Sequence, residues 1–256
     1  MYKTIFSCKN KVAVVAGGCG LLGREVVKAL SEFGALVYIA DINSKNAVNL
    51  LREKKIKYIY FDISSEDSIE KAMNEIIRKA GRIDILVNSA YPKTEDWGLK
   101  FEKVSFDSWK KNINDHLGGY FLSSRTAAEI MKEQGGGAII NLASIYGVTA
   151  PDFNIYEGTK MTMPVAYAAI KSGIIGLTRY IATYYGRHNV RANVVSPGGV
   201  FDNQNINFVR RYSQKTPLGR MAAPRDIVGA VIYLASEASS YITGCNLIVD
   251  GGWTVW

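Results

Sequence analysis

Histidine, cysteine and proline are scarce in this chain of 256 residues, which holds 2, 3 and 6 of them in that order. The three cysteines, Cys8, Cys19 and Cys245, are odd in number and far apart. A small disulfide-stabilised secreted domain would instead show an even set at close spacing. The cysteines therefore indicate free thiols in a reducing compartment, and we expect a cytoplasmic protein.

Long apolar runs are also missing. No segment approaches the roughly 20 apolar residues that a membrane-spanning helix needs, and the opening MYKTIFSCKNK lacks the apolar stretch of a secretory signal. Apolar residues make up 48% of the chain and charged residues 21%, which is ordinary for a globular protein and argues against disorder. We expect no membrane partner.

The formal net charge of +8 is compatible with an anionic substrate, a nucleic-acid partner or a generally basic proteome. The basic residues are spread along the chain, with short clusters only at 52–55 and 210–211. No nucleic-acid-binding motif accompanies them. We therefore expect a small-molecule substrate and no nucleic acid.

Short apolar runs rich in β-branched residues alternate with longer segments whose apolar residues recur at helical spacing. The predicted strands are 12–16, 35–40, 58–61, 83–87, 138–142, 190–195 and 246–249. The predicted helices are 22–33, 43–54, 65–80, 105–133, 164–185 and 224–235, and the irregular stretches are 91–104, 148–163 and 198–217. Because the strands are too apolar to have a wet face, the pattern predicts an α/β fold with a parallel sheet covered on both sides. We expect one Rossmann-type, doubly wound domain over residues 1–256.

A glycine-rich loop follows the first predicted strand and reads Gly17-Gly18-Cys19-Gly20-Leu21-Leu22-Gly23. It contains G-x-G-x-x-G at the start of a predicted helix, where backbone N–H groups can approach a pyrophosphate. The alternative is a plain glycine turn.

Two acidic residues follow the second and third predicted strands. Asp41 lies 18 residues after Gly23, where a carboxylate accepts both ribose hydroxyls of adenosine and repels a 2′-phosphate, so NAD is favoured over NADP. In the alternative interpretation Asp41 caps the next helix. Asp62 either bonds the adenine amino group or caps a loop or helix.

A tyrosine stands four residues before a lysine twice, in Tyr156–Lys160 and in Tyr167–Lys171. On a helix this spacing places both side chains on one face, so that the ammonium can stabilise a phenolate. Tyr167 and Lys171 fall in a predicted helix opened by Pro164, whereas Gly158 and Pro164 argue against a helix through Lys160. The helical context therefore favours Tyr167 and Lys171 as the chemically active pair.

Motifs over nearly the whole chain, taken together and in order, are similar to those of the short-chain dehydrogenase/reductase family. They are the glycine loop, Asp41, Leu86–Ala90, Ile139–Ser144, Tyr167-x-x-x-Lys171, Asn193–Gly198, Tyr241–Gly244 and Asp250–Gly252. The resemblance implies that Tyr167 exchanges a proton with the substrate oxygen and that Ser144 holds this oxygen. It also implies that Lys171 binds the nicotinamide ribose and, with the positive charge of the oxidised ring, brings the phenol pKa into a useful range. It implies cofactor contacts from Gly17, Gly20, Leu22, Gly23, Asp41, Asp62, Ile63, Asn88, Ala90, Tyr167, Lys171, Pro197, Gly198 and Val200. It also implies a homotetramer built on the helices 105–133 and 164–185, and no metal site is predicted.

The sequence departs from the family pattern in the cofactor region. Ala16 stands for the usual threonine, Leu21 for a glycine, Tyr91 for a glycine beside the cofactor, and Asp202 for a threonine. We expect Tyr91 either to line the substrate pocket or to face solvent.

His116 stands where the family has its active-site asparagine. It is either a relay that makes activity pH-sensitive, since histidine titrates near neutrality, or a helix residue without a catalytic part. The segment between Ser144 and Tyr167 is longer than usual, and Tyr156 lies roughly where the catalytic tyrosine would be counted. We expect Tyr156 and Lys160 to help select the substrate or to face solvent.

The stretches 156–164 and 197–204 resemble those of oxidoreductases associated with bacterial flagellin modification, which implies a sugar or sugar-phosphate-like substrate. Amides and arginines in 201–211 favour a hydroxyl-rich or anionic substrate, although a merely solvated loop is the alternative. The leading hypothesis is an NAD(H)-dependent oxidoreductase for a polar secondary alcohol or ketone. The alternatives are a 3-oxoacyl carrier-protein reductase, which Asp41 disfavours, and a non-catalytic NAD-binding or assembly protein, which the intact Ser144, Tyr167 and Lys171 disfavour.

Overall fold

The computed structural model describes residues 4–256 and contains one seven-stranded parallel sheet of order β3-β2-β1-β4-β5-β6-β7. The strands are β1 (Val12–Ala16), β2 (Leu36–Asp41), β3 (Ile56–Tyr60), β4 (Ile85–Asn88), β5 (Gly137–Leu142), β6 (Val190–Pro197) and β7 (Asn246–Val249). The order runs outward in both directions from β1 and β4, so the chain reverses its direction of winding there. The predicted doubly wound α/β sheet is confirmed, and ligands of such sheets bind outside the carboxyl ends of the strands at this reversal.

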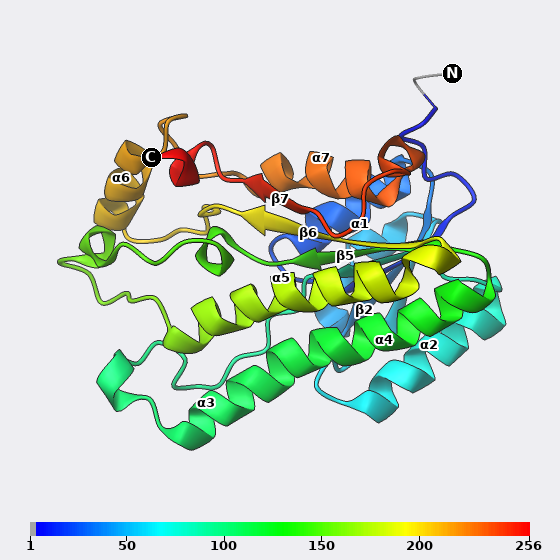
Figure 1. Cartoon of the computed structure of the whole chain (residues 1–256), viewed down its shortest axis with the longest axis horizontal. Helices are drawn as coiled ribbons and strands as arrows, with labels where there is room; N and C mark the ends of the chain where they lie inside the picture. Colours follow the sequence, from blue (N-terminus) through cyan, green and yellow to red (C-terminus); the bar gives the residue numbers. More distant parts are fainter. Residues whose placement is uncertain (1–3) are drawn as a thin grey trace.

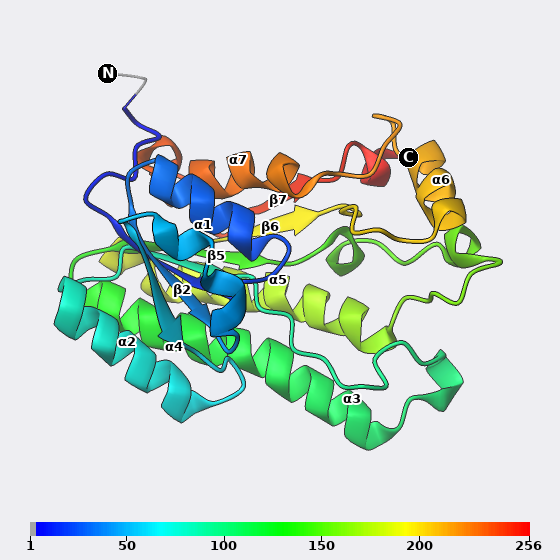
Figure 2. The same ribbon diagram turned by 180° about the vertical axis from the view of Figure 1, so that it is seen from behind.

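Helices cover both faces of the sheet (Figures 1 and 2). One face carries α2 (Glu66–Ala80), α4 (Gly119–Glu133) and α5 (Val165–Tyr185), and the other carries α1 (Gly23–Glu32) and α7 (Pro224–Ala235). Each layer closes its own apolar core, with Ile69, Met131 and Ile174 in the first and Val26 and Ile227 in the second. Burial on both faces explains why the strands show no alternation of apolar and polar residues.

The starts of α2 and α5 agree with the capping serine and the proline that the sequence indicated. Ser65 caps α2 by accepting a hydrogen bond from the Ser68 amide, and Gly81 ends this helix in the left-handed region at φ +77°. Pro164 lies immediately before α5, with extended backbone at ψ 135°. A helix therefore starts just after Pro164 and carries Tyr167 and Lys171.

Three helix predictions need correction. The predicted helix 43–54 is two short 3₁₀ helices, Ser44–Ala47 and Leu50–Arg52, because the Asn43 side chain accepts from the Lys45 amide and sets a local turn. The predicted helix 105–133 is divided into α3 (Phe106–Asn112), a π-helical turn (Ile113–Gly118) and α4. The stretch predicted as irregular after Gly198 contains α6 (Ile206–Lys215), capped by the Asn205 side chain.

A third apolar cluster lies at the carboxyl end of the sheet, beneath α6. Its buried members are Ile145, Tyr146, Ile155, Tyr156, Phe208, Tyr212, Met221 and Trp253. Figure 1 shows α6, the carboxyl terminus and the long loops gathered at this one end of the molecule. Across residues 4–256, every helix is too short or too polar to cross a lipid bilayer.

Candidate active site

The glycine-rich loop forms a cradle that side chains would fill. A Cβ atom on Gly17, which has φ +76°, would lie 2.5 Å from the Ala90 Cα, and one on Gly23 would collide with the Gly17 carbonyl oxygen. Gly20 is exposed at the rim, so its backbone is open to a ligand. The loop therefore fits the pyrophosphate of a dinucleotide at the start of α1, despite Leu21 in a glycine position.

Asp41 is fixed beside this cradle at the end of β2. One carboxylate oxygen accepts from the Cys19 amide at 2.9 Å and the other from the Asn43 amide at 2.9 Å. The Tyr58 hydroxyl donates to the Asp41 carbonyl oxygen at 2.7 Å. Burial, reinforced by the Asp41 carboxylate, raises the pKa of the Cys19 thiol to about 11, so this cysteine is unreactive at neutral pH.

Asp62 and Asn88 are engaged by neighbouring residues. Asp62 accepts from the Ser64 amide and hydroxyl, which is the capping alternative considered for it. The Asn88 amide is fully buried and is bonded to Ser123, Ser124 and Asn141. Its side chain therefore ties β4 to α4 and β5, which leaves backbone groups for any contact with a cofactor.

The remaining predicted cofactor residues surround the same end of the sheet. Ala90 is packed against Gly17, and Ile63 against Gly119. Leu22 precedes α1, and Pro197 ends β6. Gly198 donates its amide to Val249, and Val200 forms a bridge with Ala222.

Ser144, Tyr167 and Lys171 come together at the end of β5 and on the first turns of α5. Lys171 is 4% exposed, and its ammonium donates to the Leu142 carbonyl oxygen at 2.9 Å and lies 5.5 Å from the Tyr167 ring centre. Ser144 is buried and opens the short helix after β5, while Tyr167 is half-buried. The structure thus brings together the three side chains that the sequence singled out.

The pKa values in this group differ from the sequence expectation. Burial lowers the pKa of Lys171 from 10.5 to about 7, so the ammonium is a weak influence on its neighbour near neutral pH. Burial raises the pKa of Tyr167, and the Ser144 hydroxyl acts in the opposite direction. Without a cofactor, burial therefore dominates the pKa of the Tyr167 phenol, and its lowering by Lys171 with the charge of the oxidised ring stays a prediction.

His116 is fully buried in the π-helical turn, a feature that is frequent at functional sites. Its Nε2 lies 3.5 Å from the Lys171 Nζ, while Nδ1 has no hydrogen-bond partner among residues 4–256. Burial, followed by the charge of Lys171, lowers the pKa of His116 well below 6.5. The histidine is in the predicted place, and a lowered pKa favours its neutral form near pH 7; a relay role for it stays a prediction.

Tyr91 lines the site and does not simply point to solvent. Its ring packs edge-on against His116 at 5.3 Å and Tyr167 at 5.8 Å between ring centres. Trp97 donates its indole N–H to the Tyr91 hydroxyl at 2.9 Å and contacts the Tyr167 ring. Trp97 was not predicted as a site residue, because the stretch 91–104 shows no periodicity. A large aromatic side chain in an irregular segment was the one feature that could have indicated it.

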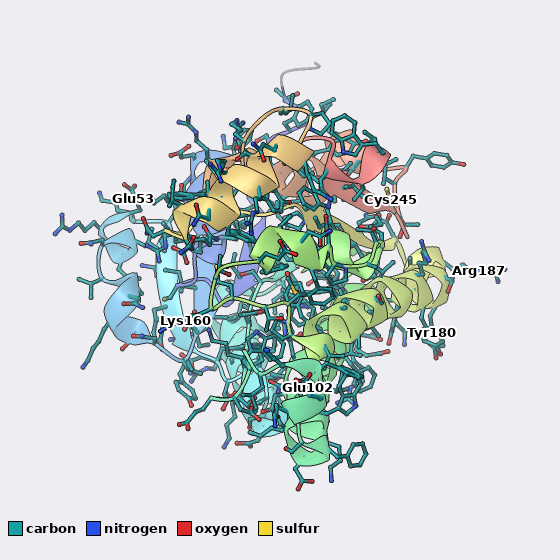
Figure 3. The ribbon with its side chains drawn as sticks, turned by 90° about the vertical axis from the view of Figure 1, so that its left-hand side faces the viewer. Glu53, Glu102, Lys160, Tyr180, Arg187 and Cys245 are labelled. Atoms are coloured by element: carbon teal, nitrogen blue, oxygen red, sulfur yellow. The ribbon has the colours of Figure 1, made fainter. Side chains whose placement is uncertain are left out.

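Tyr156 and Lys160 belong to the loop before α5, and the cluster that buries Tyr156 also contacts Tyr167. Tyr156 is buried in the third cluster against Phe208, with ring centres 5.2 Å apart, and burial raises its pKa to about 12. Lys160 is exposed, at the end of the molecule viewed in Figure 3. Lys160 faces solvent, which was one expectation for it, whereas Tyr156 is buried and its expected role in substrate selection stays a prediction.

The fold and the site together define a class of protein. A doubly wound parallel sheet has a glycine cradle at its switch point, and a serine, a tyrosine and a lysine converge beside it. This combination defines an oxidoreductase that uses a nicotinamide dinucleotide.

Comparison with known proteins places the chain among such enzymes. A family model described as "Enoyl-(Acyl carrier protein) reductase" matches residues 20–254. The chain is 35% identical over 253 residues to "Post-translational flagellin modification protein A" of Campylobacter coli, covering 96% of this chain and 98% of that protein. A short-chain dehydrogenase of Leptospira borgpetersenii with bound NAD⁺ is 34% identical with a TM-score of 0.85, covering 96% and 93% of the two chains. A gluconate 5-dehydrogenase of Burkholderia cenocepacia with NADP and tartrate is 26% identical with a TM-score of 0.89 and full coverage of both chains, 100% each.

The chain belongs to the short-chain dehydrogenase/reductase family, and it is an NAD(P)-dependent oxidoreductase. The predicted family, fold and enzyme class are confirmed.

Proposed function

We propose that this protein interconverts a polar secondary alcohol and its ketone with NAD(H), and that the substrate is a sugar or sugar-phosphate derivative in surface-glycan or flagellin-modification biosynthesis. The convergence of Ser144, Tyr167 and Lys171 beside the glycine cradle carries the proposal. A bound nicotinamide ring would accept or supply the hydride. The residues of the protein then have to orient the substrate and move one proton.

Tyr167 is the group proposed to move that proton at the substrate oxygen. During oxidation the phenolate would take the hydroxyl proton as the hydride leaves the same carbon, and during reduction the phenol would return it. Ser144 would donate to the substrate oxygen and keep it within reach of the phenol. Because burial raises the pKa of Tyr167 in the protein alone, ionisation of the phenol depends on the positive charge of the oxidised cofactor.

Lys171 and His116 are proposed to carry the proton onward. A protonated Lys171 donates to the Leu142 carbonyl oxygen and stands beside Nε2 of a neutral His116. If Nε2 accepts, the ring proton is on Nδ1, which has no partner within residues 4–256 and is suited to donate to a water or to a ligand. Lys171 would also bind the nicotinamide ribose hydroxyls.

The proposed preference for NAD rests on Asp41. Its carboxylate is held at the cradle by two backbone amides, so it has little freedom to swing away from a 2′-phosphate. The bound cofactors of the two solved relatives differ, NAD⁺ in one and NADP in the other, so the preference has to be tested on this chain.

The proposed sugar substrate is supported by two relatives named for a sugar or a sugar acid, a sorbose reductase of Candida albicans and the gluconate 5-dehydrogenase. The proposed role in flagellin modification is supported by the similarity to flagellin modification protein A. In the segment 201–211, Arg211 donates to the backbone carbonyl oxygens of Asn154 and Glu157, so its guanidinium is already engaged. A hydroxyl-rich substrate therefore suits the site better than an anion bound by Arg211.

We also propose a cytoplasmic homotetramer. Exposed aromatic side chains on the outer faces of α4 and α5, Phe121, Tyr180 and Tyr184, support contacts between subunits. Tyr180 and Tyr184 are stacked with ring centres 5.8 Å apart. Light scattering coupled to size exclusion gives the test, and a monomeric mass would contradict the tetramer.

Calorimetry with NAD and NADP, followed by turnover of a panel of sugars, alditols, nucleotide sugars and simple alcohols, tests the main proposal. We expect NAD to bind more tightly, and Asp41→Asn to shift the ratio toward NADP by about tenfold. No binding of either nucleotide, or no turnover of any alcohol or ketone, would reject the proposal. Turnover confined to a 3-oxoacyl thioester would support the 3-oxoacyl carrier-protein reductase alternative instead.

A further inference from the structure

The segment between β4 and α3 brings two aromatic side chains to the reacting groups. Trp97 contacts the Tyr91 ring at 5.6 Å and the Tyr167 ring at 6.4 Å, in edge-to-face geometry at both contacts. Tyr91 is 43% exposed, although it stands between His116 and Trp97. The two rings therefore present an accessible aromatic surface next to the catalytic phenol.

Polar residues of α3 hold this segment in place. The Asn112 side chain is 3% exposed, accepts from the Thr94 amide at 3.1 Å and donates to the Thr94 hydroxyl at 2.8 Å. The Ser108 hydroxyl donates to the Asp96 carboxylate at 2.8 Å. Trp97 follows directly and donates its own amide to the Thr94 carbonyl oxygen. The indole is thus preorganised, which lowers the ordering cost of ligand binding.

The hydroxyl of Tyr91 is oriented by Trp97. Because its oxygen accepts the indole N–H, its own proton is free to be donated to a substrate oxygen. Burial raises the pKa of Tyr91, which favours the neutral phenol as a donor near neutral pH. An apolar ring face beside a hydroxyl donor matches a sugar, whose ring has C–H groups on its faces and hydroxyls at its edge.

We propose that Tyr91 and Trp97 form the substrate-recognition wall of this enzyme, and that they select a cyclic sugar by packing against its C–H face while Tyr91 donates to one of its hydroxyls. This inference rests on the proposed oxidoreductase function and names a specificity element of the same site. A flexible acyclic alcohol would gain less from the wall, because it presents no rigid face.

The test compares substrate classes in Trp97→Ala and Tyr91→Phe, with Phe101→Ala as the control. Phe101 lies on the same segment but is 77% exposed. Wild-type kinetics are first measured on methyl pyranosides, nucleotide sugars, a hydroxysteroid and isopropanol. For the best pyranose-containing substrate, Trp97→Ala should lower kcat/KM about tenfold, mainly through KM, and should leave isopropanol turnover within about threefold. Tyr91→Phe should cause a smaller loss on the sugar, and Phe101→Ala none.

NAD affinity, measured by calorimetry on each variant, shows whether the variant is folded with its cofactor site intact. Three outcomes would each overturn the proposed wall. They are equal losses of kcat/KM on both substrate classes, no loss on the sugar, and a wild-type enzyme that prefers the steroid or isopropanol to every pyranose. These outcomes leave the oxidoreductase function standing. Wild-type protein that turns over nothing would reject the oxidoreductase and the wall together.

Discussion

Two regions of this protein carry the same tyrosine–lysine spacing and use it differently. Tyr167 and Lys171 lie on α5, where the ammonium sits under three aromatic rings, 5.5 to 5.9 Å from their centres. Tyr156 ends a short 3₁₀ helix, and Lys160 lies beyond a glycine in the left-handed region at φ +68°. A four-residue spacing therefore makes a chemical pair only where a sustained helix aligns the two side chains.

Lys171 and Lys160 also differ in their exposure to solvent. Lys171 is buried, so its charge is costly and its pKa falls to about 7, whereas Lys160 is solvated. Tyr156 is a packing residue of the third cluster, with Tyr146 and Phe208 as neighbours. The burial of Lys171 thus destabilises the charged lysine at the site, whereas the burial of Tyr156 stabilises the end of the molecule through aromatic contacts.

The largest expected contrast is between Tyr167→Phe and Tyr156→Phe. Removal of the Tyr167 hydroxyl should lower kcat by a factor on the order of 1,000, because the proton at the substrate oxygen then has no acceptor or donor. Tyr156→Phe keeps the ring in its cluster and should change kcat less than about threefold. Steady-state kinetics with matched NAD affinity make the measurement, and a large loss from Tyr156→Phe would reverse the assignment of the two pairs.

Replacing each lysine by methionine compares burial with exposure. The folded pKa of Lys171, about 7, lies below its unfolded value near 10.5, so its burial destabilises the ligand-free protein fully below pH 7. This cost is relieved as the pH rises toward 10.5. Lys171→Met should therefore raise the free energy of unfolding at pH 6 by a few kcal/mol, and by less at pH 10.

Lys160→Met is the control for this prediction and should stay within about 0.5 kcal/mol of wild type at each pH. Urea denaturation without cofactor at pH 6, 8 and 10 gives the values. A pH-independent effect of Lys171→Met would show that the buried charge is not the cause.

His116 offers a smaller test of the Lys171 environment. His116→Asn retains a donor and an acceptor, and should keep kcat within about threefold, whereas His116→Leu removes both and should lower kcat about tenfold. Since His116 is already neutral at pH 7, the pH–rate profile of His116→Asn should match the wild type between pH 6 and 8. A His116 imidazole resonance, assigned by its absence from His116→Asn, that titrates between pH 6 and 8 would contradict the neutral histidine.

The smallest expected effect concerns the attachment of α6 to the loop that carries Tyr156. Lys215 pairs with Asp152 across these two elements, and both charges reach solvent. Lys215→Met should lower the free energy of unfolding by less than about 1 kcal/mol, because water screens exposed pairs. Thermal unfolding at low and high salt measures it, and a larger, salt-insensitive loss would mean that this ion pair holds the third cluster together.

Much of the fold could be predicted because its signals are local. Apolar strands, the Ser65 cap, the Pro164 start and the glycine loop each depend on residues within one or two turns of chain. The helix predicted over 43–54 failed because Asn43 competes for backbone groups, and α6 was missed because its amide-rich start reads as a loop.

The candidate site was predictable as a set of residues but not as an environment. Ser144, Tyr167 and Lys171 could be chosen from spacing and family resemblance. The lowering of the Lys171 and His116 pKa values depends on burial of these side chains among aromatic rings from other segments. The same holds for Trp97, whose place beside Tyr167 is set by the bonds of Thr94 and Asp96 to α3.

By itself, the sequence determined the parallel α/β sheet, the glycine cradle with Asp41 and the choice of Tyr167 over Tyr156, since periodicity, turn chemistry and helix breakers act over short stretches of chain. The tertiary structure alone decided that Lys171 lies in an aromatic enclosure with a depressed pKa, that His116 stays neutral, and that Tyr91 and Trp97 line the site. Desolvation and ring contacts depend on which distant segments meet, and that is settled only when the sheet brings the carboxyl ends of its strands together.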